Sequence, residues 1–336
     1  MVTFLLGAVI ALAAVFAFLN GFRDASAAVA LSVRTRALTA NVAVLLAALF
    51  NCLGALASVA LISVFADKLF IVPEGKDGLT MLLAALISAS LWGIYLWWRG
   101  FPSSSTHALI SSLVGASLGS ALIGHRPFDG INITMWSLVL LPLILSPLIA
   151  FLLGFAAVFP SSWMARNMAP NRVNRRARQL QSVAGAAVAF GHGLQDGQRT
   201  TAVVVLALVA AGSIGAGELP LWVPIFTAVL LAVGTLFGGW RISYTLGHRL
   251  VRIDPLRGSV AQMLGAGLLF IGALVLHMPL STTHAVTAAI AGAGANQRFA
   301  ATNGRVLLRI AGAWIITPGV CVVLGALFFL ALSPLT

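Results

Sequence analysis

Hydrophobic positions in this sequence form long runs that recur along the whole chain. A run of about twenty apolar residues is long enough to cross the hydrocarbon core of a bilayer as a helix. The pattern therefore predicts an all-α polytopic membrane protein. The expected spans are residues 3–33, 40–65, 133–158, 181–213, 219–237 and 310–334.

Two further apolar regions, residues 79–122 and 259–296, are interrupted by a polar motif that occurs twice. The first copy, PSSSTHALISSLVGASLG, begins at Pro102, and the second, PLSTTHAVTAAIAGAGA, begins at Pro279. Proline suits the first turn of a helix, and serine and threonine cap the free amides of that turn. We expect two re-entrant hairpins with the motifs at their tips, because this brings Ser104–Thr106 to the middle of the bilayer. A pair of full crossings in each region is the alternative.

Composition supports the membrane assignment, and the distribution of charge orients the chain. The chain is 60% hydrophobic and 8% charged, which is too apolar for a surface that faces water. Its formal net charge is +12, and arginines are concentrated in a few expected loops, above all in residues 161–180. Because arginine-rich loops stay in the cytoplasm, we expect a multi-pass protein of the cell membrane with this loop inside and both termini outside. A nucleic-acid patch is the other interpretation of the loop, but the topology bias explains it without a further assumption.

A second duplicated motif indicates that the chain consists of two related halves. LNGFRDASAAVAL contains Asp24, and GHGLQDGQRTTAVVVLAL contains Asp196; each aspartate precedes a histidine motif by a similar length of chain. With the loop orientation given above, the two halves run in opposite directions, which is the inverted-repeat plan of secondary transporters. We therefore expect one repeat at 1–160, a second repeat at 181–336, and a basic cytoplasmic linker at 161–180.

The acidic residues divide into two groups by their position in the hydrophobic pattern. A charge at bilayer depth costs about 3 kcal/mol and usually has a function or a partner. We expect Asp24 and Asp196, the only carboxylates within long apolar runs, to serve the substrate or a coupling cation. The alternative is a structural ion pair; Arg199 has a suitable spacing from Asp196, whereas Arg23 and Asp24 point in different directions on a helix. The other acidic residues lie in expected loops: Asp67, Glu74, Asp77, Asp129, Glu218 and Asp254.

Gly21 and Gly193 each stand three residues before one of these aspartates, inside unusually long apolar runs. Such long helices exceed the bilayer core unless they tilt or break. We expect a break at each glycine, which would free backbone groups for ion coordination and place each aspartate at the start of a second half-helix. Asp24 and Asp196 are therefore candidates for a cation site.

The two histidine motifs are candidates for an anion site. Free amides at a helix N-terminus attract anions, and neutral hydroxyl donors add to this attraction. Two such ends meeting at a pseudo-two-fold axis would surround a tetrahedral oxyanion; simple capping within each helix is the alternative. The neighbouring histidines could titrate during transport, donate to the anion, or pack as hydrogen-bonding helix contacts. The hydroxyl candidates are Ser104, Ser105, Thr106, Ser281, Thr282 and Thr283, and the histidine candidates are His107, His284 and His192.

Together, NGFRDASAAVA, GHGLQDGQR, PSSSTHALISSLVGASLG and PLSTTHAV resemble the bacterial branch of the inorganic phosphate transporter (PiT) family, over essentially the whole chain. The resemblance implies an inverted-repeat symporter that moves inorganic phosphate with protons or sodium, or as a metal–phosphate complex; some relatives carry sulfate. It implies a site formed by the aspartate motifs and the hairpin tips. To the residues already named we add Arg23, Gln195, Gln198 and Arg199 as substrate-binding candidates.

The sequence departs from the family pattern beside the expected site. Ser26 and Gln195 stand where asparagine is common, and Arg23 stands where bacterial relatives often have histidine. An arginine at this position favours an anion over a cation, so the departures bear on sodium coupling more than on anion binding. No HExxH motif, nucleotide-binding glycine loop or nucleophile elbow occurs, so we expect neither an enzyme nor an enzymatic cofactor. An uncoupled anion channel is the other functional class, and the sequence leaves a homodimer open.

Overall fold

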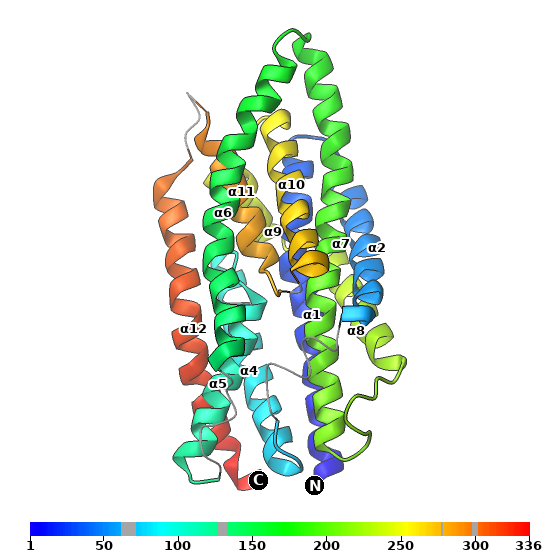
Figure 1. Cartoon of the computed structure of the whole chain (residues 1–336), viewed down its shortest axis with the longest axis vertical. Helices are drawn as coiled ribbons and strands as arrows, with labels where there is room; N and C mark the ends of the chain where they lie inside the picture. Colours follow the sequence, from blue (N-terminus) through cyan, green and yellow to red (C-terminus); the bar gives the residue numbers. More distant parts are fainter. Residues whose placement is uncertain (62–71, 126–132, 277, 298–301) are drawn as a thin grey trace.

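The computed structural model describes residues 1–61, 72–125, 133–276, 278–297 and 302–336 (Figure 1). Within these ranges the chain is helical and contains no strand, which confirms the all-α prediction. In chain order the helices are α1 (Val2–Arg34), α2 (Ala40–Ala57), η1 (Ser58–Leu61), α4 (Lys76–Arg99), α5 (Ser105–Leu122), α6 (Ile133–Ala165), α7 (Pro170–Ala210), α8 (Trp222–Leu236), α9 (Trp240–Tyr244), η2 (Thr245–Leu250), α10 (Pro255–Phe270), η3 (Ile271–Val275), α11 (Thr282–Ala295), α12 (Gly304–Leu332) and η4 (Ser333–Leu335).

Six of the described helices are long and apolar enough to cross a membrane. A seventh span results if α8 and the α9–η2 segment, which meet at a bend of 54°, count as one. The predicted spans fall on α1, α2, α6, α7, α8 and α12. Only the end of the predicted span 40–65 lies outside the described residues. α7 contains residues 181–210 of the predicted span 181–213 but is not among the six, and its second half carries several polar side chains.

Large apolar side chains cover the outside of the helix bundle. Leu45 and Leu49 on α2, Ile144 on α6, and Ile315 and Leu327 on α12 are all exposed. Asparagine, arginine, aspartate and glutamine side chains are instead buried on α1 and α7. This distribution is the reverse of that in a water-soluble protein, and it is typical of a lipid-facing exterior around a polar centre.

The two regions predicted to be re-entrant form helical hairpins whose tips meet inside the molecule. α4 ends at Arg99, the positive φ of 73° at the following Gly100 allows the chain to reverse, and α5 returns beside α4. α10 and η3 lead to the second tip, and α11 returns beside α10. In Figure 1, α5 returns toward the chain termini and α11 toward the opposite end. The ring centroids of His107 and His284, one on each tip, are only 4.8 Å apart.

The predicted breaks at Gly21 and Gly193 are wrong, because α1 and α7 continue through these glycines without interruption. The glycines allow close packing instead. A Cβ atom at Gly21 would collide with the backbone of Leu231 on α8, and one at Gly193 would collide with the backbone of Asn51 on α2. Each buried aspartate therefore lies within a continuous helix rather than at the start of a half-helix. The bend between α8 and α9 is a break that the glycine positions did not predict.

Residues 161–180 are mostly helical rather than a loop. α6 continues to Ala165, and α7 begins at Pro170, a residue suited to the first turn of a helix, so a short turn joins the two helices. Figure 1 shows this turn at one end of the molecule and both termini at the other end. Termini at the same end require an even number of crossings, and the predicted topology has an even number. Which end faces the cytoplasm stays a prediction.

Helix contacts occur in matching pairs across the two halves of the chain. α5 packs against α12 as α11 packs against α6, and α2 packs against α7 as α8 packs against α1. α1 also contacts α7, and α2 contacts α8. The polar centre of the molecule lies where α1, α7 and the two hairpin tips come together.

Candidate binding site at the hairpin tips

Two aspartates and a histidine form the centre of the candidate site. Nε2 of His192 lies 3.2 Å from Oδ2 of Asp196 and 3.7 Å from Oδ2 of Asp24. One ligand atom from each of the three residues lies within 4.8 Å of the others, and all three residues are buried. α1 and α7 thus bring together the two carboxylates that the sequence placed at bilayer depth.

The hairpin tips contribute hydroxyl groups to both carboxylates. Oγ of Ser105, on the first tip, donates to Oδ2 of Asp196 at 3.1 Å and lies 3.4 Å from Oδ2 of Asp24. Oγ1 of Thr283, on the second tip, donates to Oδ1 of Asp24 at 2.9 Å. Hydroxyls from each half of the chain therefore bind a carboxylate of the other half, which ties the two tips to one centre.

Other hydroxyls on the tips have different roles. Oγ of Ser104 accepts a hydrogen bond from the backbone amide of His107, and Oγ of Ser281 accepts one from the amide of His284. These two serines are thus N-caps, as the capping interpretation predicts for them. Oγ1 of Thr106 and Oγ1 of Thr282 are buried and have no hydrogen-bond partner among the described residues. A buried hydroxyl without a partner is unfavourable, so these two groups are suited to donate to a bound ligand.

Two buried arginines attach the tips to the central helices. Nη2 of Arg23 on α1 donates to the carbonyl and to Oγ of Ser103, both at 3.1 Å. Nη2 of Arg199 on α7 donates to the carbonyl of Leu280 at 2.9 Å. Arg199 also forms an ion pair with Asp196 through Nη1, so the spacing argument for that pair is confirmed. Arg23 and Arg199 contact corresponding positions, each directly before the serine cap of a tip.

The two glutamine candidates differ in their surroundings. Oε1 of Gln195 accepts from the backbone amide of Leu280 at 3.3 Å and from Nη2 of Arg199 at 3.4 Å, so it stabilises the second tip. Nε2 of Gln198 donates to the carbonyl of Leu194 within its own helix. Within the described part of the chain, Gln198 shares no hydrogen bond with the other candidate residues.

The tip histidines stack in a short series of rings. The ring of His107 contacts that of His284, whose centroid lies 4.1 Å from the ring of Trp314 on α12. His107 and His284 are buried, as is the rest of the site. The other acidic residues that the structure describes stand apart from this centre; Asp67 and Asp129 lie outside the described ranges.

Three polar residues of the site were missed by the sequence analysis: Asn20, Asn51 and Thr235. Nδ2 of Asn20 donates to Oδ2 of Asp196 at 2.7 Å, and Oδ1 of Asn51 lies 3.1 Å from Nδ1 of His192. All three are buried polar side chains on apolar helices, a signal that could have identified them.

A chain of hydrogen bonds determines which nitrogen of His192 donates to Asn51. Thr235 donates its single hydroxyl proton to the carbonyl of Leu231 at 2.8 Å, so it accepts from Nδ2 of Asn51 at 2.7 Å. The amide oxygen of Asn51 then faces Nδ1 of His192, which must donate. Nδ1 therefore carries a proton, and Nε2 is the nitrogen that faces the two carboxylates.

The two carboxylates of the centre differ in how many partners they already have. Asp196 already interacts with Arg199, Asn20, Ser105 and His192, which leaves little room for a metal at its oxygens. Asp24 has fewer partners, and with Nε2 of His192 it could take a cation. A metal ion beside Asp24 would have its carboxylate, Nε2 of His192 and the hydroxyls of Ser105 and Thr283 as available ligands.

Comparison with known proteins extends these observations to the whole chain. The model of the phosphate transporter family matches residues 20–325. The chain is 36% identical to a probable low-affinity inorganic phosphate transporter of Rhizobium meliloti (strain 1021), over 97% of this chain and 96% of the relative. It is 33% identical to a probable low-affinity inorganic phosphate transporter of Bacillus subtilis (strain 168), over 95% of this chain and 94% of the relative.

A solved structure shares the fold. It is named "The sodium-dependent phosphate transporter", and it matches with a TM-score of 0.85 and 20% identity, over 98% of this chain and 99% of that one. These similar proteins are transporters, and the resemblance of the sequence motifs is confirmed. The family match and the full-length relatives show that this chain belongs to the phosphate transporter family.

Proposed function

We propose that this protein is a symporter that moves inorganic phosphate across the cell membrane together with a proton. The observation that carries the proposal is the balance of charge in the buried centre, where Asp24 and Asp196 are accompanied by Arg23 and Arg199. A phosphate anion that enters would add negative charge at low dielectric constant, which is costly unless a cation enters with it. The names of the bacterial relatives support phosphate as the anion.

The proton would bind at Nε2 of His192, between the two carboxylates. A protonated imidazole at this position satisfies both Asp24 and Asp196 and offsets the charge of the incoming anion. The relay through Asn51 and Thr235 supports this role, because it leaves only Nε2 to titrate. The similar solved structure is named a sodium-dependent transporter, so sodium is the competing cation for the same carboxylates.

Phosphate would bind at the N-termini of α5 and α11, on the side of Ser105 and Thr283 that faces away from the carboxylates. Thr106 and Thr282 have free hydroxyls there, and the helix ends contribute free amides and a favourable dipole. Ser105 and Thr283 would link this anion to the carboxylates, since Ser105 donates to Asp196 and Thr283 donates to Asp24. Binding of the anion and of the proton would thus be coupled through shared side chains.

The access route would alternate between the two sides of the membrane. The central residues are buried, so phosphate and proton can exchange with solvent only after the two hairpins move relative to α1 and α7. The duplicated motifs and the matching helix contacts support two inverted repeats, 1–160 and 181–336, that exchange roles during this movement. Residues 161–180 would join the repeats on the cytoplasmic side.

The decisive experiment is uptake of labelled phosphate by vesicles that contain the purified protein. An inward proton gradient should drive accumulation above equilibrium, and a sodium gradient at equal pH should not. Excess sulfate should reduce the uptake little. Accumulation that requires sodium would replace the proton in this proposal. Equilibration without accumulation would indicate a channel, and complete competition by sulfate would indicate a less selective oxyanion permease.

A further inference from the structure

A basic pocket lies apart from the central site, where the end of α4 meets α9 and η2. Its volume is about 350 Å³. It is lined by Trp98, Arg99, Gly100, Trp240, Arg241, Tyr244 and Arg249. Three of the seven lining residues are arginines, and none is acidic.

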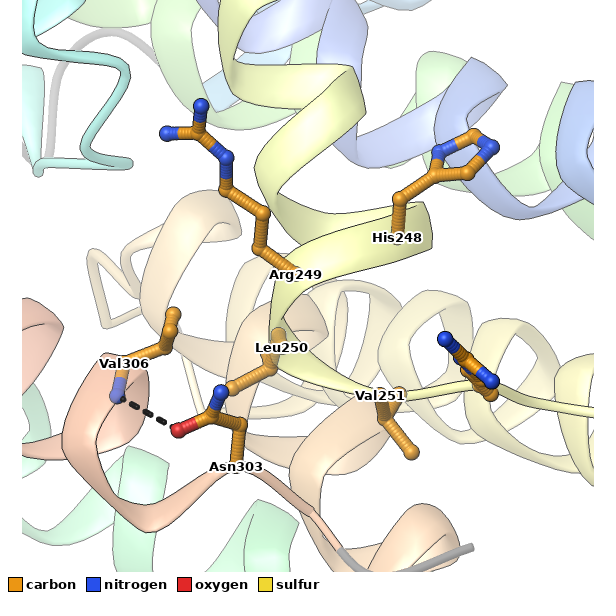
Figure 2. A pocket seen from close by; sticks show the side chains of 7 residues that line it. His248, Arg249, Leu250, Val251, Asn303 and Val306 are labelled. Atoms are coloured by element: carbon orange, nitrogen blue, oxygen red, sulfur yellow. Dashed lines mark hydrogen bonds between the residues drawn. The ribbon is translucent and has the colours of Figure 1, made fainter.

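A second pocket of about 310 Å³ adjoins the first and shares Arg249 with it. Figure 2 shows Arg249 and His248 leaving the end of η2 on different sides, with Asn303 and Val306 below Arg249. Arg252 also lines this pocket. The backbone amide of Asn303 donates to the carbonyl of Leu250, which joins η2 to the start of α12, at the end of the molecule away from the termini.

Aromatic rings and a backbone carbonyl hold these arginines at the pocket walls. Nη1 of Arg241 donates to the carbonyl of Trp98 at 3.0 Å, and its guanidinium lies 5.3 Å from the ring centre of Trp97. The guanidinium of Arg249 lies 5.3 Å from the ring centre of Tyr244. Such cation–π contacts orient a guanidinium but leave its charge in place.

The positive charge of the pocket has no counterpart within the described part of the chain. No described carboxylate lies within ion-pairing distance of Arg99, Arg241, Arg249 or Arg252, although Arg199 and Arg257 elsewhere are paired. The three unpaired arginines that line the first pocket repel one another, and an anion between them would reduce this repulsion. Planar guanidinium groups match the oxygens of a phosphate group particularly well.

We propose that the first pocket, between the end of α4 and the α9–η2 segment, binds the phosphate of an anionic phospholipid headgroup. Trp98, Trp240 and Tyr244, which line it, are 59%, 43% and 53% exposed, so exposed rings stand beside the arginines. Aromatic side chains next to arginines are typical of the headgroup level of a membrane, where basic pockets between helices bind anionic lipids. Inorganic phosphate has the same recognition chemistry, but it does not explain the exposed aromatic rim.

The test is a binding experiment that does not depend on transport. Phosphatidylglycerol is titrated into the purified full-length protein in phosphatidylcholine micelles, and bound lipid is counted by native mass spectrometry. The triple variant Arg99→Gln, Arg241→Gln, Arg249→Gln should bind about a hundredfold more weakly, because each arginine near an anionic surface contributes about a fivefold gain. The matched control is Arg172→Gln, Arg175→Gln, Arg176→Gln, which removes the same charge from exposed positions near the start of α7.

Retention of phosphatidylglycerol by the control variant and its loss by the pocket variant would support the proposal. The double variant Arg99→Gln, Arg249→Gln keeps the bond from Arg241 to Trp98, so it tests the pocket even if the triple variant folds poorly. Its affinity should lie between those of the wild type and the triple variant. Equal affinity in the pocket and control variants would overturn the proposal, as would displacement of the lipid by inorganic phosphate alone.

Discussion

At the scale of single residues, adjacent hydroxyls on the tips have different partners. Ser105 and Thr283 donate to the carboxylates, Ser104 and Ser281 cap their helices, and the hydroxyls of Thr106 and Thr282 have no hydrogen-bond partner within the described ranges. The sequence predicts all of these positions as one set of donors. The differences arise because adjacent residues at a helix start point in different directions.

Substitution of either buried carboxylate should abolish concentrative uptake while the protein still folds. In Asp24→Asn and Asp196→Asn the site loses the negative charge that would hold a proton at His192, so accumulation of labelled phosphate in vesicles should stop. Glu218→Gln, at an exposed position, is the control and should accumulate phosphate normally. Wild-type accumulation by both aspartate variants would remove these residues from the mechanism.

The free hydroxyls of Thr106 and Thr282 should act together on one anion. Loss of a hydroxyl donor to a charged group costs about 1.5–3 kcal/mol, so Thr106→Val and Thr282→Val should each weaken phosphate binding roughly ten- to hundredfold. If they share one ligand, a double-mutant cycle measured by phosphate binding should be non-additive. Thr80→Val removes a buried, unpartnered hydroxyl from the first turns of α4 and should leave phosphate affinity unchanged. If Thr106→Val, Thr282→Val and the double variant all kept the phosphate affinity of the wild type, the two motifs would be helix starts without a role in binding.

At the scale of the elements, the central helices owe their close approach to glycine. α1 contacts the backbone of α8 at Gly21, and α7 contacts the backbone of α2 at Gly193. Long helices can therefore lie side by side around the polar centre without a break. A short interhelical distance is also required for side chains such as Asn51 and Thr235 to reach across to the site.

A methyl group at Gly21 should therefore destabilise the protein. Gly21→Ala would force apart α1 and α8, at a cost of about 1–3 kcal/mol, typical of overpacking. Gly7→Ala in the same helix is the matched control, because nothing lies within 4 Å of its Cβ position. That change should be neutral or stabilising by about 0.5–1 kcal/mol. Thermal unfolding in detergent compares the two variants, and equal midpoints would contradict the packing role of Gly21.

At the scale of the whole molecule, both termini lie at one end and the α6–α7 turn at the other. The arginines near that turn and around the basic pocket predict that this end faces the cytoplasm. The structure agrees with the relative placement of the ends, and the absolute orientation and a homodimer stay predictions.

Orientation can be tested with single cysteines at opposite ends. A membrane-impermeant thiol reagent applied to intact cells should label Ala216→Cys, in the exposed turn after α7, and should not label Asn174→Cys until the cells are opened. The unaltered protein measures the background, since Cys321 is buried and Cys52 is partly buried. Labelling of position 174 from outside would reverse the assigned topology.

Features that depend on short stretches of chain can be predicted from the residues alone. The length of an apolar run predicts a span, the caps predict where α5 and α11 begin, and a carboxylate inside an apolar run indicates a functional centre. For this reason the helices, the hairpins and the pairing of Asp24 with Asp196 could be predicted. Each of these features follows from local chemistry and from the repetition of one motif.

Features that depend on partners far apart in the chain follow only from how the helices pack. Asn20 and Asp196, or Asn51 and His192, meet only because two long helices cross, and no local pattern records which residues lie at the crossing. In the sequence, Gly21 predicts a break in its helix. In the folded protein it allows α1 to pack closely against the backbone of Leu231 on α8. Arg99 and Arg249 likewise indicate only topology in the sequence, and they form a pocket because the end of α4 packs beside α9 and η2.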